Sequence, residues 1–299
     1  MAARFWAVLL AVRLLVAAGA AAWTGAIVGI PAAAAAVGVA LWYAIPVAAV
    51  AVSLAAARSH AYPGEPPAGV ARLLRVLYAE AWQVDIALLR MVAEPLRARL
   101  DEAVPDTHAA AQVVLVHGIA CNRAVWRPLL AALHGAGIES VHAIDLEPLF
   151  ADIDTYARKL LARIEAIGAS PARPVAIVAH SMGGLVARAA LREAAPGTIG
   201  RIITVGTPHH GTVVACPFGW PSTRQMCRGS DWLLELNARQ EGKPGVPVTS
   251  LYSLDDNLIV PADSAVLRGG RSVGLRGMGH LGLLRSPQVL RRIVSELRS

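Results

Sequence analysis

Cysteine is scarce in this chain of 299 residues, which contains only Cys121, Cys216 and Cys227. Three cysteines cannot build the framework of a small disulfide-stapled fold, and no Cys or His spacing is typical of a metal site. Cys216 and Cys227 share one loop-like segment and would pair if that loop faced an oxidising compartment. We therefore expect no disulfide framework and no metal.

Charge is missing altogether over residues 14–57. As one helix this run would be about 66 Å long, roughly twice the hydrocarbon core of a bilayer. Two membrane spans fit the run, and we predict them near residues 14–30 and 37–57, with Pro31 in the turn between them. Arg13 precedes the first span and is expected to extend its charged group to the membrane surface.

A cleaved signal peptide is the alternative for the first apolar run. Arg4 provides a basic start, and the alanine-rich stretch at 17–22 offers small residues for cleavage. The second run would still be a membrane span.

Basic residues flank both ends of the apolar run, so the positive-inside rule places both ends of a hairpin in the cytoplasm. A disulfide would instead require an oxidising compartment, so the membrane side stays open.

Lysine is nearly absent, and the net charge of +7 comes almost entirely from arginine. Several arginines follow the apolar run directly, at positions 58, 72, 75, 90, 97 and 99. They favour attraction to anionic lipid head groups. No block of Lys and Arg is interleaved with aromatic residues, so we expect a membrane partner and no nucleic acid.

The segment after the apolar run contains linkers at 59–69 and 101–111 and a long amphipathic pattern between them. A helix is expected over 70–100, interrupted near Pro95. This helix would either pack on the following domain or lie along the bilayer surface. We expect three parts: a membrane anchor of two apolar helices over 1–58, a linker with an amphipathic helix over 59–111, and a folded domain over 112–299.

From residue 112, short β-branched runs alternate with helical segments. Strands are predicted over 113–116, 141–144, 175–179, 201–205, 248–252 and 271–275, and helices over 123–134, 153–167, 184–194 and 287–297. The alternation predicts an α/β domain with a mainly parallel sheet and helices on both faces. Active sites of such sheets lie at the carboxyl ends of the strands. Residues 213–245 show little periodicity beyond a helix at 231–237, which is typical of a lid, a substrate wall or a surface insertion.

One stretch, VAIVAHSMGGL at 175–185, predicts a nucleophile. A strand, a tight turn with a central serine and a helix form the nucleophile elbow, which lifts the hydroxyl off the sheet beside a helix N-terminus. The turn requires small residues two positions before and two after Ser181, and Ala179 and Gly183 occupy these positions. Glycine is usual at both, so Ala179 is a departure, although a methyl group is the smallest one available.

A serine nucleophile needs a base and a carboxylate that orients the base, and the chain order expected for this elbow is Ser, acid, His. Asp255 and Asp256 both lie in a turn after the predicted strand at 248–252, and either is a candidate acid. His280 lies in a glycine-rich loop after the last strand, and an imidazole there is suited to accept and return the serine proton.

Donors for a developing oxyanion are expected from the residue after the nucleophile and from the loop after an early strand. These donors are the N–H groups of Met182 and Ile119. His117, in the same early loop, is expected to be structural and to form hydrogen bonds within the loop. Chemistry of this kind requires no metal and no organic cofactor.

Five motifs together resemble the bacterial triacylglycerol lipases and carboxylesterases of the α/β-hydrolase superfamily: VLVHGIACNRAVW, AHSMGGL, ITVGTPHHGT, LYSLDDNLIVPADSA and GMGHLGLL. They occur in that family's order and cover the chain from about residue 113 onward, without the apolar segment. AHSMGG is itself similar to the Bacillus members. In those lipases the acid is the Asp four residues after the strand Tyr, which implies Asp256 counting from Tyr252. The resemblance also implies structural roles for His209 and His210 and implies that His280 is the base.

The resemblance implies an α/β-hydrolase fold, here preceded by a transmembrane helical hairpin. It implies a serine hydrolase that cleaves carboxylic esters through an acyl-enzyme, acting on acylglycerols or other lipid esters, with a lipid or small ester as its partner. The expected location is the bacterial inner membrane. Hydrolysis of thioesters or amides by the same fold is one alternative, and a membrane-anchored protein that binds without catalysis is another.

Overall fold

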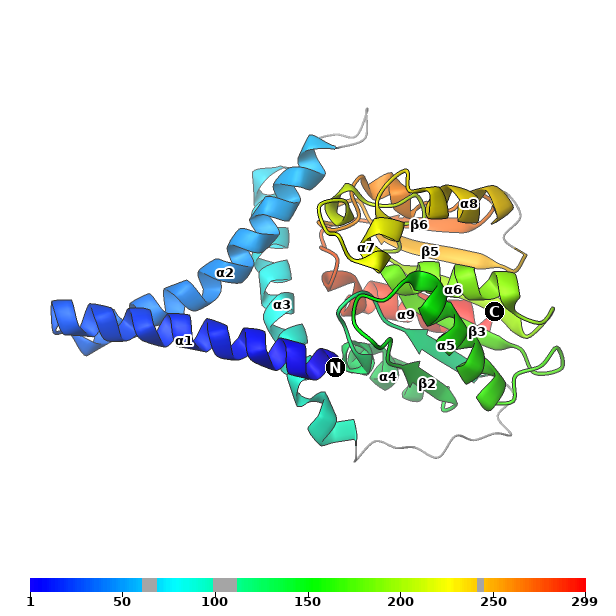
Figure 1. The fold of residues 1–299 in the computed structure, drawn as a ribbon, viewed down its shortest axis with the longest axis horizontal. Coiled ribbons are helices and arrows are strands. Elements are labelled where there is room, and N and C mark those ends of the chain that lie inside the picture. The colour runs from blue at the N-terminus through cyan, green and yellow to red at the C-terminus, as the bar shows by residue number, and fades with distance from the viewer. Residues whose placement is uncertain (61–68, 99–111, 241–244) are drawn as a thin grey trace.

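The structure, a computed structural model, describes residues 1–60, 69–98, 112–240 and 245–299 (Figure 1). The linkers expected at 59–69 and 101–111 lie almost wholly outside the described residues. The expected division of the chain at residues 59 and 112 stays a prediction.

A six-stranded parallel sheet forms the centre of the C-terminal part, in the order β2-β1-β3-β4-β5-β6. The strands are β1 (Gln112–Val116), β2 (Val141–Ile144), β3 (Val175–His180), β4 (Ile199–Val205), β5 (Val248–Ser253) and β6 (Arg271–Leu275). Each lies within one or two residues of a predicted strand. Strands β1 and β3 are buried almost throughout, as expected for short β-branched runs covered on both faces. The predicted parallel α/β sheet is confirmed.

Helices cover both faces of this sheet (Figure 1). One face packs against α5 (Ile153–Ala166), α6 (Met182–Glu193) and α8 (Asp231–Gln240), and the other against α4 (Arg127–His134) and α9 (Pro287–Arg298). A 3₁₀ turn at Arg123–Trp126 replaces the first part of the helix predicted over 123–134, because Pro128 starts a new α-helix in its first turn.

The chain order places a topological switch point between β1 and β3. After β1 the chain moves outward to β2, then returns across the sheet to β3 on the other side of β1. In open α/β sheets, the loops that leave the strands on either side of such a point diverge at the carboxyl edge of the sheet. Ligands of such sheets bind in the crevice between these loops.

The apolar N-terminal run forms two long helices, α1 (Ala2–Val28) and α2 (Pro31–Ser59). They meet at Gly29, which has a left-handed φ of 68°, and Pro31 starts the second helix. Both helices are longer than the spans predicted at 14–30 and 37–57. Both are long and apolar enough to cross a bilayer, and only 6% and 17% of their most apolar windows are buried in the protein.

Arg13 does not extend to a membrane surface as expected. Its side chain is 7% exposed and pairs with Asp85 of the third helix, α3 (Val70–Ala98). It also donates a 3.0 Å hydrogen bond from Nε to the carbonyl of Trp42, and its guanidinium lies 3.9 Å from the centre of the Trp42 ring. Arg13 thereby joins α1, α2 and α3 into one helical unit.

Helix α3 lies between the apolar hairpin and the sheet (Figure 1). On one side, Val76 and Ala81 pack against Val50 and Leu54 of α2, and on another Met91 joins the core beneath β1. Of the two alternatives for this helix, the structure therefore has packing on the folded domain. The interruption expected at Pro95 is wrong, because α3 continues through this residue to Ala98.

Residues 213–245, for which the sequence predicts only one helix, contain two α-helices within their described part. Helix α7 (Pro221–Met226) was not predicted, and α8 is three residues longer than the expected 231–237. Cys216 and Cys227 form a disulfide across this segment, with their Cα atoms 4.6 Å apart. The pairing left open by the sequence is therefore present.

The Arg13–Asp85 pair generates a stability prediction. Asp85→Ala should lower the free energy of unfolding by about 3–5 kcal/mol, because it leaves a buried guanidinium without its counter-charge. Thermal and denaturant unfolding of the full chain in detergent would measure the loss. Glu235→Ala, which breaks an exposed pair with Arg239, is the control and should cost under about 0.5 kcal/mol. Equal small effects would contradict the assignment of Arg13 and Asp85 as the buried link.

Candidate active site

The turn after β3 has the geometry of a nucleophile elbow. Ser181 follows the last strand residue directly and has φ 55° and ψ −127°, a conformation that is strained for a residue with a side chain. Its N–H donates to the Val205 carbonyl at 2.9 Å, and its own carbonyl accepts from the Thr207 hydroxyl at 2.9 Å. These neighbours hold the strained turn in place.

Gly183 is required by the close approach of this turn to β1. A Cβ at residue 183 would lie 2.7 Å from the carbonyl oxygen of His117, and nearer still to that of Val116. Ala179, two residues before the serine, is completely buried in the sheet. The structure therefore accommodates the methyl group of Ala179 where the usual pattern has glycine.

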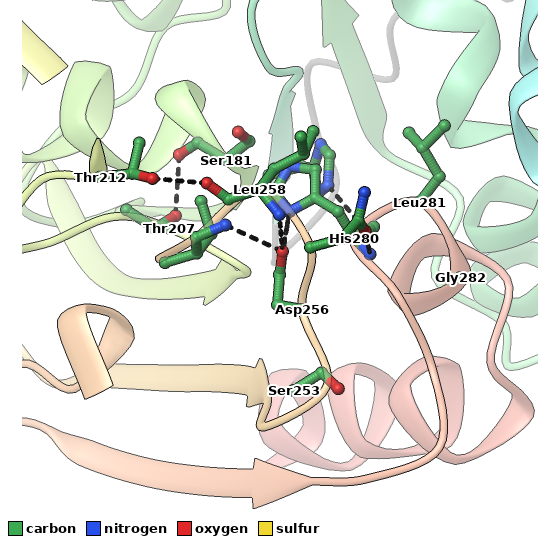
Figure 2. Close-up of polar contacts among 12 residues, drawn as sticks. Ser181, Thr207, Thr212, Ser253, Asp256, Leu258, His280, Leu281 and Gly282 are labelled. Atoms are coloured by element: carbon green, nitrogen blue, oxygen red, sulfur yellow. Dashed lines mark hydrogen bonds and ion pairs between the residues drawn. The ribbon is translucent and has the colours of Figure 1, made fainter. Parts of the chain in front are cut away.

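Asp256 and His280 contact each other across the loops that follow β5 and β6 (Figure 2). His280 Nδ1 lies 2.9 Å from Asp256 Oδ2 and 3.1 Å from Oδ1. The backbone N–H groups of Leu258 and Ile259 donate to Asp256 Oδ1 at 2.8 and 3.0 Å. Both side chains are buried, so the carboxylate is held in one orientation, and Nε2 of the imidazole makes no hydrogen bond within the described parts of the chain.

Burial alone would lower the pKa of His280. The neighbouring Asp256 carboxylate and, behind it, that of Glu80 outweigh burial and raise the pKa of His280 above its ordinary value. The adjacent His180, whose ring centre lies 4.6 Å from that of His280, has a pKa well below the ordinary value because of burial and the His280 charge. Of these two histidines, His280 is therefore the one that can take up a proton near neutral pH.

Gly206 lies next to both the Asp256–His280 pair and the residue that holds the elbow, Val205. A Cβ built on Gly206 would lie 3.3 Å from both Asp256 Oδ2 and His280 Cε1, and Gly206 follows the strand that accepts the Ser181 N–H. Among the described residues no hydrogen bond joins the Ser181 hydroxyl to His280. Such contacts are often long before substrate binds and tighten in the complex.

Asp255 points away from His280. Its Oδ2 accepts from the Gly277 N–H at 2.6 Å, and its Oδ1 lies 3.4 Å from Arg72 Nε of α3. The two adjacent carboxylates, which the sequence left as alternatives, therefore have different partners in the structure.

The loop after β1 carries the second expected oxyanion donor. His117 bridges the loop: its Nε2 accepts from the Leu146 N–H at 3.0 Å, and its Nδ1 donates to the Gly118 carbonyl at 2.8 Å. A Cβ on Gly118 would lie 2.9 Å from that of Ser181, so this loop runs directly beside the elbow. The N–H of Ile119 is not a donor in any hydrogen bond among the described residues, and Met182 opens α6 with its N–H outside the helical pattern.

His209 and His210 lie behind the elbow. His209 is completely buried between the Arg188 guanidinium, 3.4 Å away, and the Thr204 hydroxyl, 3.1 Å away. Burial, aided by the Arg188 charge, holds the pKa of His209 well below its ordinary value. This placement agrees with the structural role that the family resemblance implied. The part of the chain that the structure describes contains no cluster of His, Cys, Asp or Glu that would hold a metal ion.

Two residues at the site were missed by the sequence analysis, Glu80 and Asn257. Glu80 contacts the loop that carries His280, and Asn257 Oδ1 accepts from the His280 N–H at 3.0 Å. The sequence contains one indication of a role for Glu80. It is an acidic residue on the apolar face of α3, three residues after Leu77, where a hydrophobic residue would be expected. Asn257 carries no comparable signal.

A row of aromatic rings lies along the same edge of the sheet. Phe5 of α1 contacts Phe150 edge-on, Phe150 stacks on Trp220 with ring centres 4.0 Å apart, and Trp220 stacks on Phe218 at 5.4 Å. Phe218 and Trp220 are 46% and 42% exposed. Trp6, next to Phe5, donates to the carbonyl of Ala120 in the loop after β1. The row thus begins beside the expected oxyanion loop and presents apolar surface to the outside.

Comparison with known proteins agrees with this architecture. The profile described as "Alpha/beta hydrolase family" matches residues 113–266. Over 149 residues the chain is 31% identical to a triacylglycerol lipase of Burkholderia plantarii, covering 46% of this chain and 41% of the lipase. The chain therefore spans less than half the length of that curated relative.

Solved structures share the fold at low sequence identity. The mature form of the lipase BlEst2 from Bacillus licheniformis is 19% identical with a TM-score of 0.55, covering 65% of this chain and 94% of that one. Phospholipase PlaB from Legionella pneumophila is 15% identical with a TM-score of 0.56, covering 64% of this chain and 60% of that one.

Proposed function

Because the chain belongs to the alpha/beta hydrolase family, we propose that it is a serine hydrolase that cleaves carboxylic esters of lipids. The observation that carries the proposal is the buried Asp256–His280 pair, 2.9 Å between Oδ2 and Nδ1, beside the strained elbow at Ser181. A positioned carboxylate, a basic imidazole and a serine on such an elbow are the parts that acyl transfer needs.

In the proposed reaction the Ser181 hydroxyl attacks the ester carbonyl carbon while His280 Nε2 takes the hydroxyl proton. Asp256 keeps Nδ1 protonated and stabilises the imidazolium that forms. The tetrahedral intermediate breaks its bond to the alcohol, which leaves with the proton from His280. Water then attacks the carbonyl carbon of the acyl-serine while His280 takes a proton from the water. The second tetrahedral intermediate breaks its bond to Ser181, which receives this proton from His280, and the carboxylic acid is released.

The negative oxygen of both tetrahedral intermediates would be stabilised by the N–H groups of Met182 and Ile119. Met182 is the first residue of α6, so the helix dipole adds to its effect. The bridged His117 fixes the loop that presents Ile119. No step requires a metal or an organic cofactor.

Three features support a lipid ester as the substrate. The aromatic row from Phe5 to Phe218 offers apolar contact at the edge of the site, as an acyl chain would require. The apolar helices α1 and α2 fit a hairpin that anchors the protein in a bilayer. The Burkholderia plantarii relative is a triacylglycerol lipase.

The role of Ser181 is tested by covalent labelling. A fluorophosphonate probe should modify Ser181 in the folded full chain, and peptide sequencing by mass spectrometry would identify the modified residue. Ser181→Ala should abolish both labelling and ester hydrolysis, because no other hydroxyl occupies the elbow. Labelling that persists in Ser181→Ala, or none in the folded wild type, would contradict the mechanism.

The two adjacent aspartates provide a matched pair for the acid. Asp256→Asn should lower kcat by about 10³–10⁴-fold, because it removes the carboxylate that orients His280. It should also move the acidic limb of the pH–rate profile to lower pH, since Asp256 raises the pKa of His280. Asp255→Asn should lower kcat by less than about tenfold. Equal losses in the two variants, measured on p-nitrophenyl esters, would show that the assignment within the pair is wrong.

The aromatic row predicts a dependence on acyl-chain length. Trp220→Ala should lower kcat/KM about tenfold for a dodecanoyl ester and under about twofold for an acetyl ester, because only the long chain reaches the row. Trp23→Ala, which removes an exposed ring of α1 outside the site, serves as the control. A loss independent of chain length would place the acyl chain elsewhere.

A further inference from the structure

Three successive backbone N–H groups in the loop that carries His280 each donate to a side chain. The N–H of His280 donates to Asn257 Oδ1 at 3.0 Å, that of Leu281 to Glu80 Oε1 at 2.6 Å and that of Gly282 to Glu80 Oε2 at 2.9 Å. Figure 2 shows His280 next to Asp256, with Leu281 and Gly282 on the other side of His280. Glu80 and Asn257 therefore hold the backbone from which the imidazole of His280 projects.

Glu80 reaches this loop from outside the hydrolase match. It lies on α3, 201 residues before Leu281 and well before the matched residues 113–266. Its side chain is 2% exposed and fits against Gly279, where a Cβ would lie 2.6 Å from Glu80 Oε2. The absence of a side chain at Gly279 therefore makes room for the carboxylate.

Electrostatics couple Glu80 to the candidate triad. Burial raises the pKa of Glu80 to about 7, although the Leu281 and Gly282 N–H groups and the charge of His280 lower it, and Asp256 raises it slightly. The ionised Glu80 in turn raises the pKa of His280. Burial and the charge of His280 hold the pKa of His180, whose ring lies beside that of His280, well below its ordinary value.

From this geometry we infer that Glu80 is a positioning residue for the reaction, which rests on the function proposed above. Its two oxygens hold the backbone of residues 281–282, so that the imidazole of His280 keeps one orientation between Asp256 and Ser181. When ionised, Glu80 also stabilises with its negative charge the imidazolium that forms when His280 takes the serine proton. Helix α3 is therefore part of the active site.

Two further contacts tie the N-terminal helices to the same loops. Asn257, which accepts from the His280 N–H, donates from Nδ2 to the Ser53 hydroxyl of α2 at 3.0 Å. Arg72 of α3 pairs with Asp255, next to Asp256. The loops that carry the base and the acid are thus both held by helices α2 and α3.

The test compares Glu80→Gln with Glu94→Gln in the full chain in detergent. Glu94 lies on the same helix and pairs with Arg123, away from the His280 loop. Glutamine has the shape of glutamate but lacks its charge, and its NH₂ group cannot accept from one of the two N–H groups. Glu80→Gln should lower kcat about tenfold with KM within about twofold, and should move the acidic limb of the pH–rate profile to lower pH. Glu94→Gln should leave both unchanged.

A purely structural role for Glu80 predicts a different result. In that case kcat would fall only as far as the fraction of folded protein falls, and the acidic limb would not move. That outcome would overturn the proposal. A kcat within about twofold of the wild-type value together with an acidic limb at the wild-type pH would also overturn it.

A conservative variant keeps the test decisive if Glu80→Gln does not fold. Glu80→Asp retains the charge but is one methylene too short to meet both N–H groups. It should keep the acidic limb near that of the wild type and lower kcat about threefold or more, whereas unchanged kcat would overturn the proposal. Fluorophosphonate labelling separates this result from a failure of the proposed function. If the wild type is not labelled at Ser181, the hydrolase mechanism fails whatever Glu80 does.

Discussion

The hydrogen-bonded pair of Asp256 and His280 is the interaction on which the rest of this site depends. Burying an aspartate and a histidine is unfavourable unless each finds partners. The Leu258 and Ile259 N–H groups meet the carboxylate, while Asn257 and Glu80 fix the backbone of the histidine loop. Because the strands are parallel and in register, both loops leave the sheet at one edge, where the Ser181 elbow also lies. The sheet brings these groups together, and the buried partners keep them there.

The N-terminal helices are more than an appendage to this sheet. Arg13 and Asp85 join α1 to α3, hydrophobic contacts join α2 to α3, and Glu80, Ser53 and Trp6 reach the loops at the sheet edge. These contacts place the proposed active site directly beside the apolar hairpin of α1 and α2. If the hairpin lies in a bilayer, a lipid ester has only a short distance to travel from the membrane to the serine.

The region that matches the hydrolase family and the N-terminal helices contribute different parts of the proposed site. The matched region, residues 113–266, contains the elbow, the acid loop and the loop after β1. Residues 1–98 supply contacts to these loops from outside that region, and the alignment with the Burkholderia plantarii lipase covers less than half of either chain. The hydrolase fold therefore accounts for the chemistry proposed here, and the helices account for how its loops are held.

Local signals in the sequence determined the strands, the elbow and the apolar helices, because each depends on the pattern of a few neighbouring residues. Short β-branched runs specify the strands, and a serine between Ala179 and Gly183 specifies the turn. The different partners of Asp255 and Asp256, the burial of Arg13 and the place of Glu80 became visible only in the tertiary structure. Adjacent carboxylates in a turn point in different directions, and the partner of a charge on one helix is set by the helix packed against it. His280, the partner of Asp256, is 24 residues away along the chain, and Leu281, a partner of Glu80, is 201 residues away, where no local pattern reaches.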